Sequence, residues 1–365
     1  MMETVILSFV TSFVVVLFAT PPLITVAKMK NLIDEPNDRK LHKSSIPTIG
    51  GIIIFAAALF AFALWFPADS LESYQNLLKS TNDLKYTVAT VILLFFIGIK
   101  DDIIGTAPMK KLIAHVIVGL VLVLMANVRL TSMYGLFGIY TLPEWASIFL
   151  SLFTYIVIVN AFNLIDGVDG LAAGVGFIVC FSFGIWFFLV GEPVLTALSF
   201  SLGGALLGFL IFNFYPAKIF MGDSGSLTIG LIVSILAIKL IEYDISGMEG
   251  TFVQISKPVF AISVLIYPLF DTLRIFIYRA MNGTSPFAAD KNHIHHRLIA
   301  NGLTQRQTTL TIYIVNVFLI FLAILFAGLD QSMALVLLGL VSAGLVFLPG
   351  LLKRRHYRVG KPHVS

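Results

Sequence analysis

Carboxylates, amides and histidines, which can hold divalent cations and move protons, are gathered in five short motifs of this chain. The motifs are DEPNDRKLHKSSIPTIGG (34–51), DDIIG (101–105), NAFNLIDGVDGL (160–171), NFYPAKIFMGDSGS (213–226) and SPFAADKNHIHHR (285–297). Each motif lies at the end of a hydrophobic run. Ionisable side chains are costly within a bilayer, so their collection at the ends of apolar segments indicates a site at a membrane surface.

Two adjacent aspartates, Asp101 and Asp102, directly follow a hydrophobic run. Neighbouring carboxylates at a membrane surface repel each other and lose hydration, so we expect them to face a cation or to act as a base. A solvated helix end is the alternative interpretation. Lys111 begins the next hydrophobic run, near the two aspartates, where it can pair with a phosphate.

An amide or a carboxylate recurs at every third position of the third motif, at Asn160, Asn163, Asp166 and Asp169. Residues i and i+3 share a face of an α-helix, so this spacing predicts one polar stripe at a helix end. Gly167 and Gly170 permit a tight turn and a close approach of the backbone to a ligand. The alternative is a polar helix cap.

The sequence FMGDSGS (220–226) predicts a turn that opens the next helix. Gly222 and Gly225 would leave backbone N–H groups free there, and a helix N-terminus favours an anion such as phosphate. Asp223 suits Mg²⁺, which takes hard oxygen ligands and is held by one or two carboxylates together with substrate phosphates. An aspartate or serine that caps the helix is the alternative, and capping is compatible with binding.

Three histidines, His293, His295 and His296, lie in a long connection between two hydrophobic runs, and long loops are often functional. Zinc is a minor alternative here. The single cysteine, Cys180, lies inside an apolar run, and the HxHH spacing does not suit a zinc site. Contacts of the imidazoles with phosphate or sugar fit better, and a solvated loop is the remaining alternative.

Composition places these motifs in a polytopic membrane protein with an all-α fold. Of the 365 residues, 58% are hydrophobic and 12% are charged, and the mean hydropathy is +0.94, whereas soluble domains average about 25% charged residues. The apolar runs are long enough to cross roughly 30 Å of hydrocarbon, and we expect about eleven transmembrane helices. Their expected ranges are 4–27, 47–66, 84–100, 111–128, 144–162, 171–190, 194–212, 225–242, 258–279, 308–327 and 332–352.

Charge bias predicts the orientation. With the N-terminus outside, most Lys and Arg residues fall on the cytoplasmic side, and so do all five motifs and the C-terminus. Residues 1–29 lack a cationic leader region, which indicates an uncleaved first helix. We expect one integral-membrane domain over residues 1–352 and a basic cytoplasmic tail over 353–365. The net charge of +4 is better explained by loops that face anionic lipid than by nucleic acid.

Carboxylates for Mg²⁺, cationic side chains and glycine turns for phosphates, and a membrane on one side together indicate phosphoryl transfer to or from a lipid-borne partner. The motifs DDxxG, NxxNxxDGxDGL, FMGDxGS and HxHH occur in this order within residues 28–307. They resemble those of the polyprenyl-phosphate N-acetylhexosamine-1-phosphate transferases, the superfamily of WecA, TagO and MraY. The pattern is most similar to the WecA/TagO branch, because the MraY branch has an unbroken three-histidine run, whereas Ile294 splits that run here.

This resemblance implies an enzyme that transfers a sugar-1-phosphate, GlcNAc-1-phosphate before other hexosamines, from a UDP-sugar to undecaprenyl phosphate and releases UMP. It implies a multi-pass protein of the bacterial inner membrane that acts at the first membrane step of a cell-surface polysaccharide pathway. Mg²⁺ is the implied cofactor, with Mn²⁺ as an alternative, and a homodimer is compatible with the family.

The resemblance also assigns roles to residues. Asp223 would be the metal ligand, and Asp101 and Asp102 would orient or deprotonate the lipid phosphate or support the metal. The full expected set of catalytic residues is Asp101, Asp102, Lys111, Asn163, Asp166, His293, His295 and His296, the histidines contacting the diphosphate or the sugar. Asp169, Asn213 and Phe220 match positions that hold the nucleoside in this family. The full expected set of substrate-binding residues is Arg39, His42, Asn160, Gly167, Asp169, Asn213, Phe220 and Arg297.

Two alternatives stay open at this point. A transferase of the MraY type would use UDP-MurNAc-pentapeptide as its donor. A cation-coupled membrane transporter would place its carboxylates in the middle of spans and would show a pseudo-symmetric repeat. Asp101, Asp166 and Asp223 lie at the ends of the expected spans, which favours the enzyme.

Overall fold

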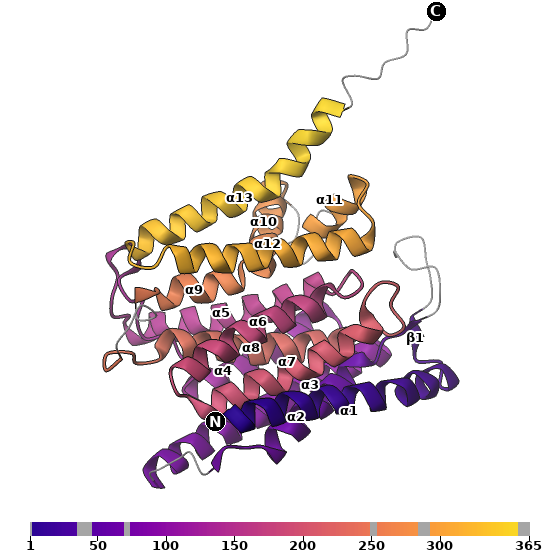
Figure 1. The fold of residues 1–365 in the computed structure, drawn as a ribbon, viewed down its shortest axis with the longest axis horizontal. Coiled ribbons are helices and arrows are strands. Elements are labelled where there is room, and N and C mark those ends of the chain that lie inside the picture. Colours follow the sequence, from indigo (N-terminus) through magenta and orange to yellow (C-terminus); the bar gives the residue numbers. More distant parts are fainter. Residues whose placement is uncertain (1, 35–45, 69–73, 249–253, 284–292, 357–365) are drawn as a thin grey trace, which may run out of the picture. The chain divides into compact units, whose positions relative to one another are not determined.

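The computed structural model describes residues 2–34, 46–68, 74–248, 254–283 and 293–356, and it is almost entirely helical (Figure 1). Every apolar run that we expected to be a span lies largely within helical segments of the structure. The chain divides into two compact units, Met1–Met248 and Glu249–Ser365. The carboxylate motifs belong to the first unit and the described part of the histidine motif belongs to the second.

In the first unit, α8 is the most deeply buried of the helices that are candidate membrane spans, and α2, α3, α5 and α6 pack against it. Between its first and last turns no residue of α8 is charged, which is typical of a helix enclosed by other helices. Figure 1 shows α1 running beside α7, which in turn packs against α6. The helices are α1 (Met2–Met29), α2 (Gly50–Leu64), α3 (Tyr74–Ile104), α4 (Pro108–Leu124), α5 (Glu144–Ile165), α6 (Leu171–Leu189), α7 (Pro193–Asn213) and α8 (Gly222–Glu242).

Glycines allow α2 and α3 to touch the first turn of α8. A Cβ atom on Gly51 of α2 would lie 2.1 Å from the backbone nitrogen of Gly225, and a Cβ on Gly98 of α3 would lie 2.5 Å from the Cα of Ser224. Both contacts are shorter than real Cβ contacts, so only glycine fits without moving a backbone. These glycines thereby let two helices, α2 and α3, pack closely around the N-terminus of a third, α8.

The first motif also holds the loop that precedes α8. Two short antiparallel strands, β1 (Ile33–Asp34) and β2 (Ile46–Pro47), flank residues 35–45, which lie outside the described residues. The carbonyl of Pro47, at the end of β2, accepts the N–H of Phe220 (2.7 Å), and the N–H of Gly50 donates to the Phe220 carbonyl (2.9 Å). The segment 47–51 therefore positions the FMGD turn through main-chain hydrogen bonds.

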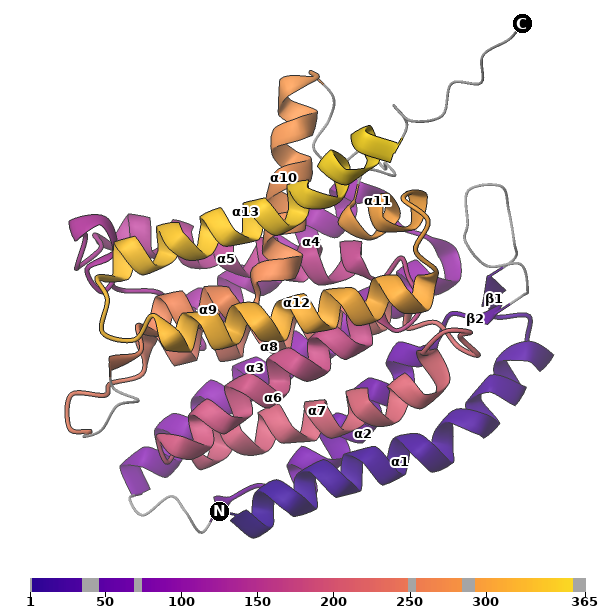
Figure 2. The same ribbon diagram turned by 45° about the horizontal axis from the view of Figure 1, so that its top comes forward.

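The second unit contains a helix pair that the sequence led us to expect as one span, 258–279. The structure instead breaks it into α9 and α10, bent by 77° (Figure 2). Pro268 has no N–H to donate to the carbonyl of residue 264, which breaks the helical pattern at this point. The helices of this unit are α9 (Lys257–Val264), α10 (Ile266–Met281), α11 (Ile294–Ala300), α12 (Gln305–Leu325) and α13 (Gln331–His356).

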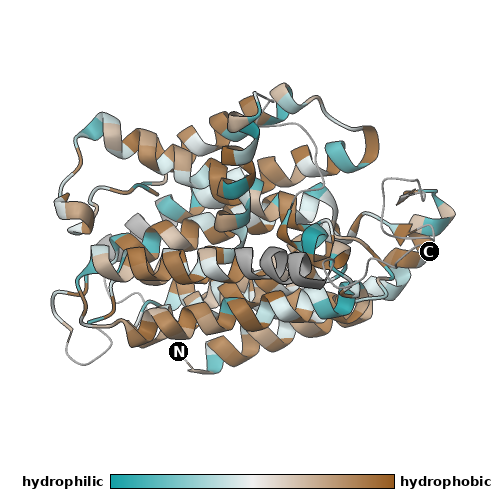
Figure 3. Cartoon of the chain, turned by 90° about the horizontal axis from the view of Figure 1, so that it is seen from above, coloured by the Kyte–Doolittle hydropathy of each residue, from teal (hydrophilic) through white to brown (hydrophobic). Residues whose placement is uncertain are grey.

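Helix length and hydropathy support a membrane protein. Among the described residues, six helices are long and apolar enough to cross a bilayer, or seven if the bent pair α9–α10 is one span. Figure 3 shows hydrophobic residues along most of the helices, with hydrophilic ones concentrated toward their ends and in the loops. Large apolar side chains such as Phe18, Phe96 and Phe149 are exposed, as lipid-facing residues are.

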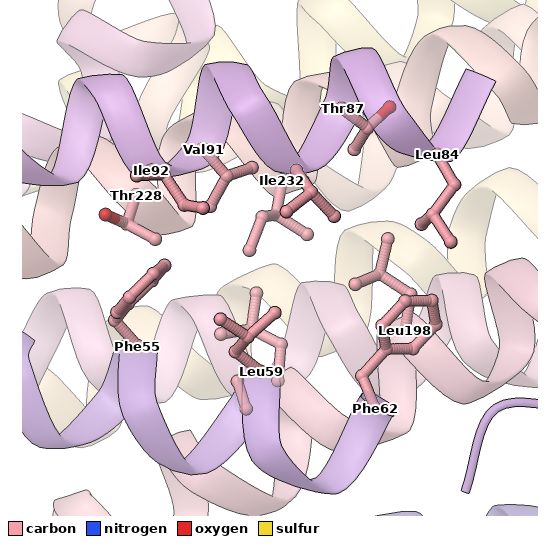
Figure 4. Close-up of a pocket in the computed structure, with 13 residues that line it drawn as sticks. Phe55, Leu59, Phe62, Leu84, Thr87, Val91, Ile92, Leu198, Thr228 and Ile232 are labelled. Atoms are coloured by element: carbon pink, nitrogen blue, oxygen red, sulfur yellow. The ribbon is translucent and has the colours of Figure 1, made fainter. Parts of the chain in front are cut away.

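An apolar pocket of about 530 Å³ lies among α2, α3, α7 and α8 (Figure 4). Phe55, Phe62, Val91 and Ile232 are among its lining residues, which are apolar except for two threonines. None of the predicted catalytic or metal-binding residues is among the residues that line it. The polar site is therefore separate from the pocket.

Candidate active site

The N-terminus of α8 is the point at which the carboxylates of the first unit meet. Gly222 (φ +73°) turns the chain into the helix, and Asp223 follows in the first turn. The carboxylate of Asp102, near the end of α3, accepts hydrogen bonds from the N–H of Asp223 (2.6 Å) and from the N–H (3.1 Å) and hydroxyl (2.6 Å) of Ser224. A helix start has unbonded N–H groups and a positive dipole end. Asp102 therefore caps α8 from another helix.

Asp166 provides a second carboxylate at the same helix start, where it is hydrogen-bonded to the backbone of Gly222. Burial raises the pKa of Asp166 well above its usual range, and the neighbouring charges of Asp223 and Asp102 raise it further. We expected this turn to leave its N–H groups free for a phosphate, and this was wrong for those of Asp223 and Ser224. The protein's own carboxylate occupies them.

Lys111, in the first turn of α4, pairs with carboxylates from two other helices. Its Nζ lies 3.1 Å from Oδ2 of Asp101 in α3 and also contacts Oδ2 of Asp223 in α8. Gly105 (φ +78°) permits the sharp turn between α3 and α4 that brings Lys111 back toward Asp101. The three side chains are 15–26% exposed, so none of them is fully buried.

The pKa values of the two adjacent aspartates, which follow the apolar run 84–100, are shifted in opposite directions. Burial alone would raise the pKa of Asp101, but hydrogen bonds with Asp223 and Lys111 hold it below its usual value. Burial raises the pKa of Asp102 to about 6, although the hydrogen bonds from Ser224 and Asp223 favour its ionised form. Neighbouring acids with separated pKa values are typical of sites in which each has a different task.

Asn163 fixes the orientation of Asp223. Its amide Nδ2 donates to Oδ1 of Asp223 (2.7 Å) and to the hydroxyl of Ser226 (3.0 Å), one turn along α8. Oδ1 is thereby held by α5, which leaves Oδ2 on the side of Lys111 and Asp101. The structure thus brings together the predicted residues Asp101, Asp102, Lys111, Asn163, Asp166 and Asp223.

The donor set at this point fits Mg²⁺. Oδ2 of Asp101 and Oδ2 of Asp223 both contact one cationic group, the ammonium of Lys111, so two hard oxygen ligands already converge on a positive charge. Among the described residues, no group of three or more His, Cys, Asp or Glu side chains could hold a metal by itself. Mg²⁺ is commonly bound by one or two carboxylates with the remaining positions filled by phosphates and water.

Asp169 and Asn213, which we expected at a nucleoside, connect two loops. Oδ2 of Asp169 accepts the N–H of Ala217 (2.9 Å). Asn213 is buried, and its side chain accepts the N–H of Gly170 (3.1 Å) and donates to the carbonyl of Ile219 (2.9 Å). These bonds tie the turn after α5 to the loop before α8.

The predicted polar stripe is only partly helical, because α5 ends at Ile165. Asn160 and Asn163 are in the helix, Asp166 is its C-terminal cap, and Asp169 lies in the turn that follows. Asn160 donates to the carbonyl of Ile156 in its own helix (2.7 Å). The prediction of a single helical stripe was therefore wrong beyond Asn163, since the glycine-rich turn redirects the last two members.

The histidines of the second unit are organised by a residue that we had not predicted. Asp271 of α10 lies 2.8 Å from Nδ1 of His293, and the hydroxyl of Tyr267 lies 3.3 Å from Nδ1 of His295. The rings of His293 and His295 are parallel, with centroids 5.4 Å apart. Burial lowers the pKa of His295 to about 3.

Four of the remaining predicted residues lie in α11, in the turn after α5 or in the loop before α8. His296 follows His295 in α11, with ring centroids 4.4 Å apart, and Arg297 is the next residue of that helix. Gly167 is exposed in the turn after α5. The backbone of Phe220 is held by the segment that follows β2, as described above. The last two, Arg39 and His42, lie outside the described residues.

Sequence reasoning missed several residues of these networks, among them Ser224, Ser226, Tyr267 and Asp271. The serines were visible only as part of a helix cap, and their partners come from other helices. Asp271 carried a clearer signal, because it is a carboxylate inside the apolar run 258–279. An ionisable residue within such a run is itself an indication of function.

Comparison with known proteins finds a family match over the part of the chain that carries these carboxylates. Residues 84–241 match the model of the family described as Glycosyl transferase family 4. A Mycobacterium tuberculosis (strain H37Rv) protein named "Decaprenyl-phosphate N-acetylglucosaminephosphotransferase" is 33% identical over 94% of this chain and 88% of its own length.

Two further relatives have similar names. The Bacillus subtilis (strain 168) "Probable undecaprenyl-phosphate N-acetylglucosaminyl 1-phosphate transferase" is 32% identical over 86% of this chain and 83% of its own. The Escherichia coli (strain K12) "Undecaprenyl-phosphate alpha-N-acetylglucosaminyl 1-phosphate transferase" is 31% identical over 77% of this chain and 73% of its own length. The matched residues include the carboxylates that meet at the start of α8. The chain therefore belongs to the family of polyprenyl-phosphate N-acetylhexosamine-1-phosphate transferases, as a protein of the WecA/TagO type.

Proposed function

We propose that this protein transfers GlcNAc-1-phosphate from UDP-GlcNAc to undecaprenyl phosphate, giving undecaprenyl-diphosphate-GlcNAc and UMP. The observation that carries the proposal is the contact of Lys111 with both Asp101 and Asp223 at the N-terminus of a buried apolar helix. A positive charge between carboxylates at the end of apolar helices suits a diphosphate donor and a lipid acceptor. The names of the relatives support GlcNAc and a polyprenyl phosphate.

Mg²⁺ is the cofactor in this proposal, with Mn²⁺ as a substitute, held by Asp223 and supported by Asp101. When bound, the ion neutralises charge on the diphosphate and on the departing UMP. Asn163 orients the Asp223 carboxylate for this role, since it holds Oδ1 and leaves Oδ2 on the side of Lys111. Once a donor is bound, Lys111 can exchange its carboxylate partners for phosphate oxygens, because Lys is a common phosphate ligand.

The reaction that we propose is a direct displacement. An oxygen of the lipid phosphate forms a bond to the β-phosphorus of the donor, and the bond from that phosphorus to the bridging oxygen breaks, so that UMP leaves with the electron pair. Positioning and charge stabilisation supply most of the rate in such transfers. A two-step route with Asp102 as nucleophile is less suited, because both its oxygens already accept hydrogen bonds from α8.

Several finer features belong to the same proposal. We place about eleven helices across the inner membrane of a bacterium, with the N-terminus outside and the carboxylate and histidine motifs on the cytoplasmic side, because positive charge marks that side. Residues 1–352 would act as one catalytic domain, 353–365 as a basic tail, and a homodimer would be compatible with the family. Asp169, Asn213 and Phe220 would contact the nucleoside from the two tied loops, and the histidines would contact the diphosphate or sugar.

The test is UMP release by the purified full-length protein in detergent with undecaprenyl phosphate, Mg²⁺ and a panel of UDP-sugars. We expect release with UDP-GlcNAc and none with UDP-MurNAc-pentapeptide, and the Asp223→Asn variant should be folded and inactive. Release with the muramyl donor alone would indicate an MraY-type enzyme. Folded protein that releases UMP from no donor would contradict the proposal and reopen the transporter alternative.

A further inference from the structure

Asp271 is a fully buried carboxylate inside the apolar helix α10, with 0% of its surface exposed. Its Oδ1 accepts hydrogen bonds from the backbone N–H of Ile294 (2.9 Å) and from the guanidinium of Arg274 (3.2 Å). Its Oδ2 lies 2.8 Å from Nδ1 of His293. A charge in an apolar helix is costly unless it is paired, and such residues are retained mainly for function.

These contacts determine which nitrogen of His293 carries a proton. The Arg274 guanidinium and the Ile294 N–H both favour the ionised carboxylate, which can only accept hydrogen bonds. The 2.8 Å contact then requires a hydrogen on Nδ1 of His293, whether the ring is neutral or charged. Nε2 is left as the ring nitrogen whose bonding can change.

The same carboxylate holds the start of the helix that carries the other histidines. His293 is the N-cap residue of α11, but its side chain makes no capping hydrogen bond. Asp271 supplies the missing acceptor by bonding the N–H of Ile294, the first residue of that helix. Tyr267, one turn earlier in α10, reaches Nδ1 of His295. One face of α10 thus orients two of the three histidines.

We propose that Asp271 is a positioning residue of the phosphosugar transfer: it holds His293 as the Nδ1–H form, so that Nε2 is the atom that bonds to the substrate. This inference rests on the proposed function, and it adds a residue to which no role has been assigned above. Carboxylates that orient a functional histidine in this way act through the ring and do not touch the substrate themselves.

The first measurement is made on the wild-type protein, with one variant used only to assign the signals. In protein labelled with ¹⁵N-histidine, the His293 resonances, identified by their loss in His293→Gln, should show a protonated Nδ1 across neutral pH. A His293 ring protonated only on Nε2 would overturn the proposal. This spectrum is independent of catalysis, so it can succeed or fail separately from the UMP assay. If wild-type protein releases no UMP, the proposed function fails whatever the spectrum shows.

The second measurement is a pair of kinetic variants. Asp271→Asn should lower kcat for UMP release roughly ten- to a hundredfold, as expected when the partner of a functional histidine is removed. The double variant Asp271→Asn, His293→Gln should be no slower than His293→Gln alone, because both changes remove the same contribution. Asp330→Asn is the matched control, since Asp330 also accepts a backbone N–H at a helix start of this unit and should change kcat little.

Two results would contradict the role of Asp271. One is a wild-type kcat in folded Asp271→Asn protein. The other is a double variant in which the losses multiply, because Asp271 would then act on something other than His293. If Asp271→Asn does not fold, the spectrum of the wild-type ring still decides the question.

Discussion

Asp102 and Ser224 link α3 to α8 through two hydrogen bonds: Oδ2 of the aspartate accepts both the hydroxyl of Ser224 (2.6 Å) and its backbone N–H (3.1 Å). Asp101, the preceding residue, makes a different set of contacts and pairs with Lys111. Consecutive residues at a helix end point in different directions, so one carboxylate faces α8 and the other faces the cation. The two halves of the DD motif therefore have separate tasks.

This separation predicts different losses of stability. Asp102→Ala should lower the thermal midpoint of the detergent-solubilised protein, because it removes the cap of α8, and a helix cap contributes about 0.5–2 kcal/mol. Asp101→Ala is the matched control, since it removes a partly exposed ion pair and side-chain hydrogen bonds but no cap of α8. Both variants should lose UMP release. Equal thermal midpoints for the two variants would show that Asp102 does not act as a cap.

Lys111 should compete with a divalent cation for the two carboxylates. In Lys111→Met, with no substrate present, Asp101 and Asp223 lose their shared positive partner. Binding of Mn²⁺, followed by electron paramagnetic resonance, should then be roughly tenfold tighter, while UMP release should fall, because a phosphate ligand is lost. Lys110→Met is the control, since Lys110 is exposed and adjacent in sequence. Unchanged Mn²⁺ affinity in Lys111→Met would place the metal elsewhere.

The glycine contact between α2 and α8 should not tolerate a methyl group. In Gly51→Ala, the new Cβ would lie 2.1 Å from a backbone nitrogen of α8, so the helices must separate, at a cost of roughly 1–3 kcal/mol or more. We expect a lower thermal midpoint and a loss of activity, because α8 also carries Asp223. Gly339→Ala in α13, where no atom lies within 4 Å, should leave both unchanged or slightly improve stability. A normal midpoint for Gly51→Ala would contradict the close packing.

His295 predicts a pH dependence of stability. Burial lowers the pKa of His295 to about 3, whereas an unfolded histidine has a pKa near 6.5. Below about pH 6.5 the unfolded chain takes up a proton that the folded protein does not, so stability is complete above this pH and falls as the pH drops toward 3. The loss at pH 5 is about 2 kcal/mol.

The comparison is between thermal midpoints at pH 7.5 and pH 5 for wild type and His295→Gln. Other groups titrate in both proteins, so only the difference between the two pH dependences reports on His295. The variant should lose less stability on acidification than wild type. An identical drop in both proteins would mean that His295 takes up its proton in the folded state.

Much of the fold could be predicted because helix formation in an apolar chain is a local property. Each of the eleven expected spans lies largely within helical segments, and the described parts of the polar motifs lie at or beside helix ends. The exceptions have local causes that were underestimated. Pro268 divides the run 258–279 into two helices, and the glycine-rich turn after Ile165 interrupts the stripe that begins at Asn160.

The sequence by itself determined the helical membrane architecture, the family, and the carboxylates that meet at the start of α8, because these depend on composition and on residues close along the chain. Only the tertiary structure decided which side chains contact one another. Asp102 caps a helix 121 residues away, Asn163 orients a carboxylate 60 residues away, and Asp271 holds a histidine 22 residues away. Such pairings follow from helix packing, in which glycine contacts and burial fix the neighbours, and no local spacing encodes them.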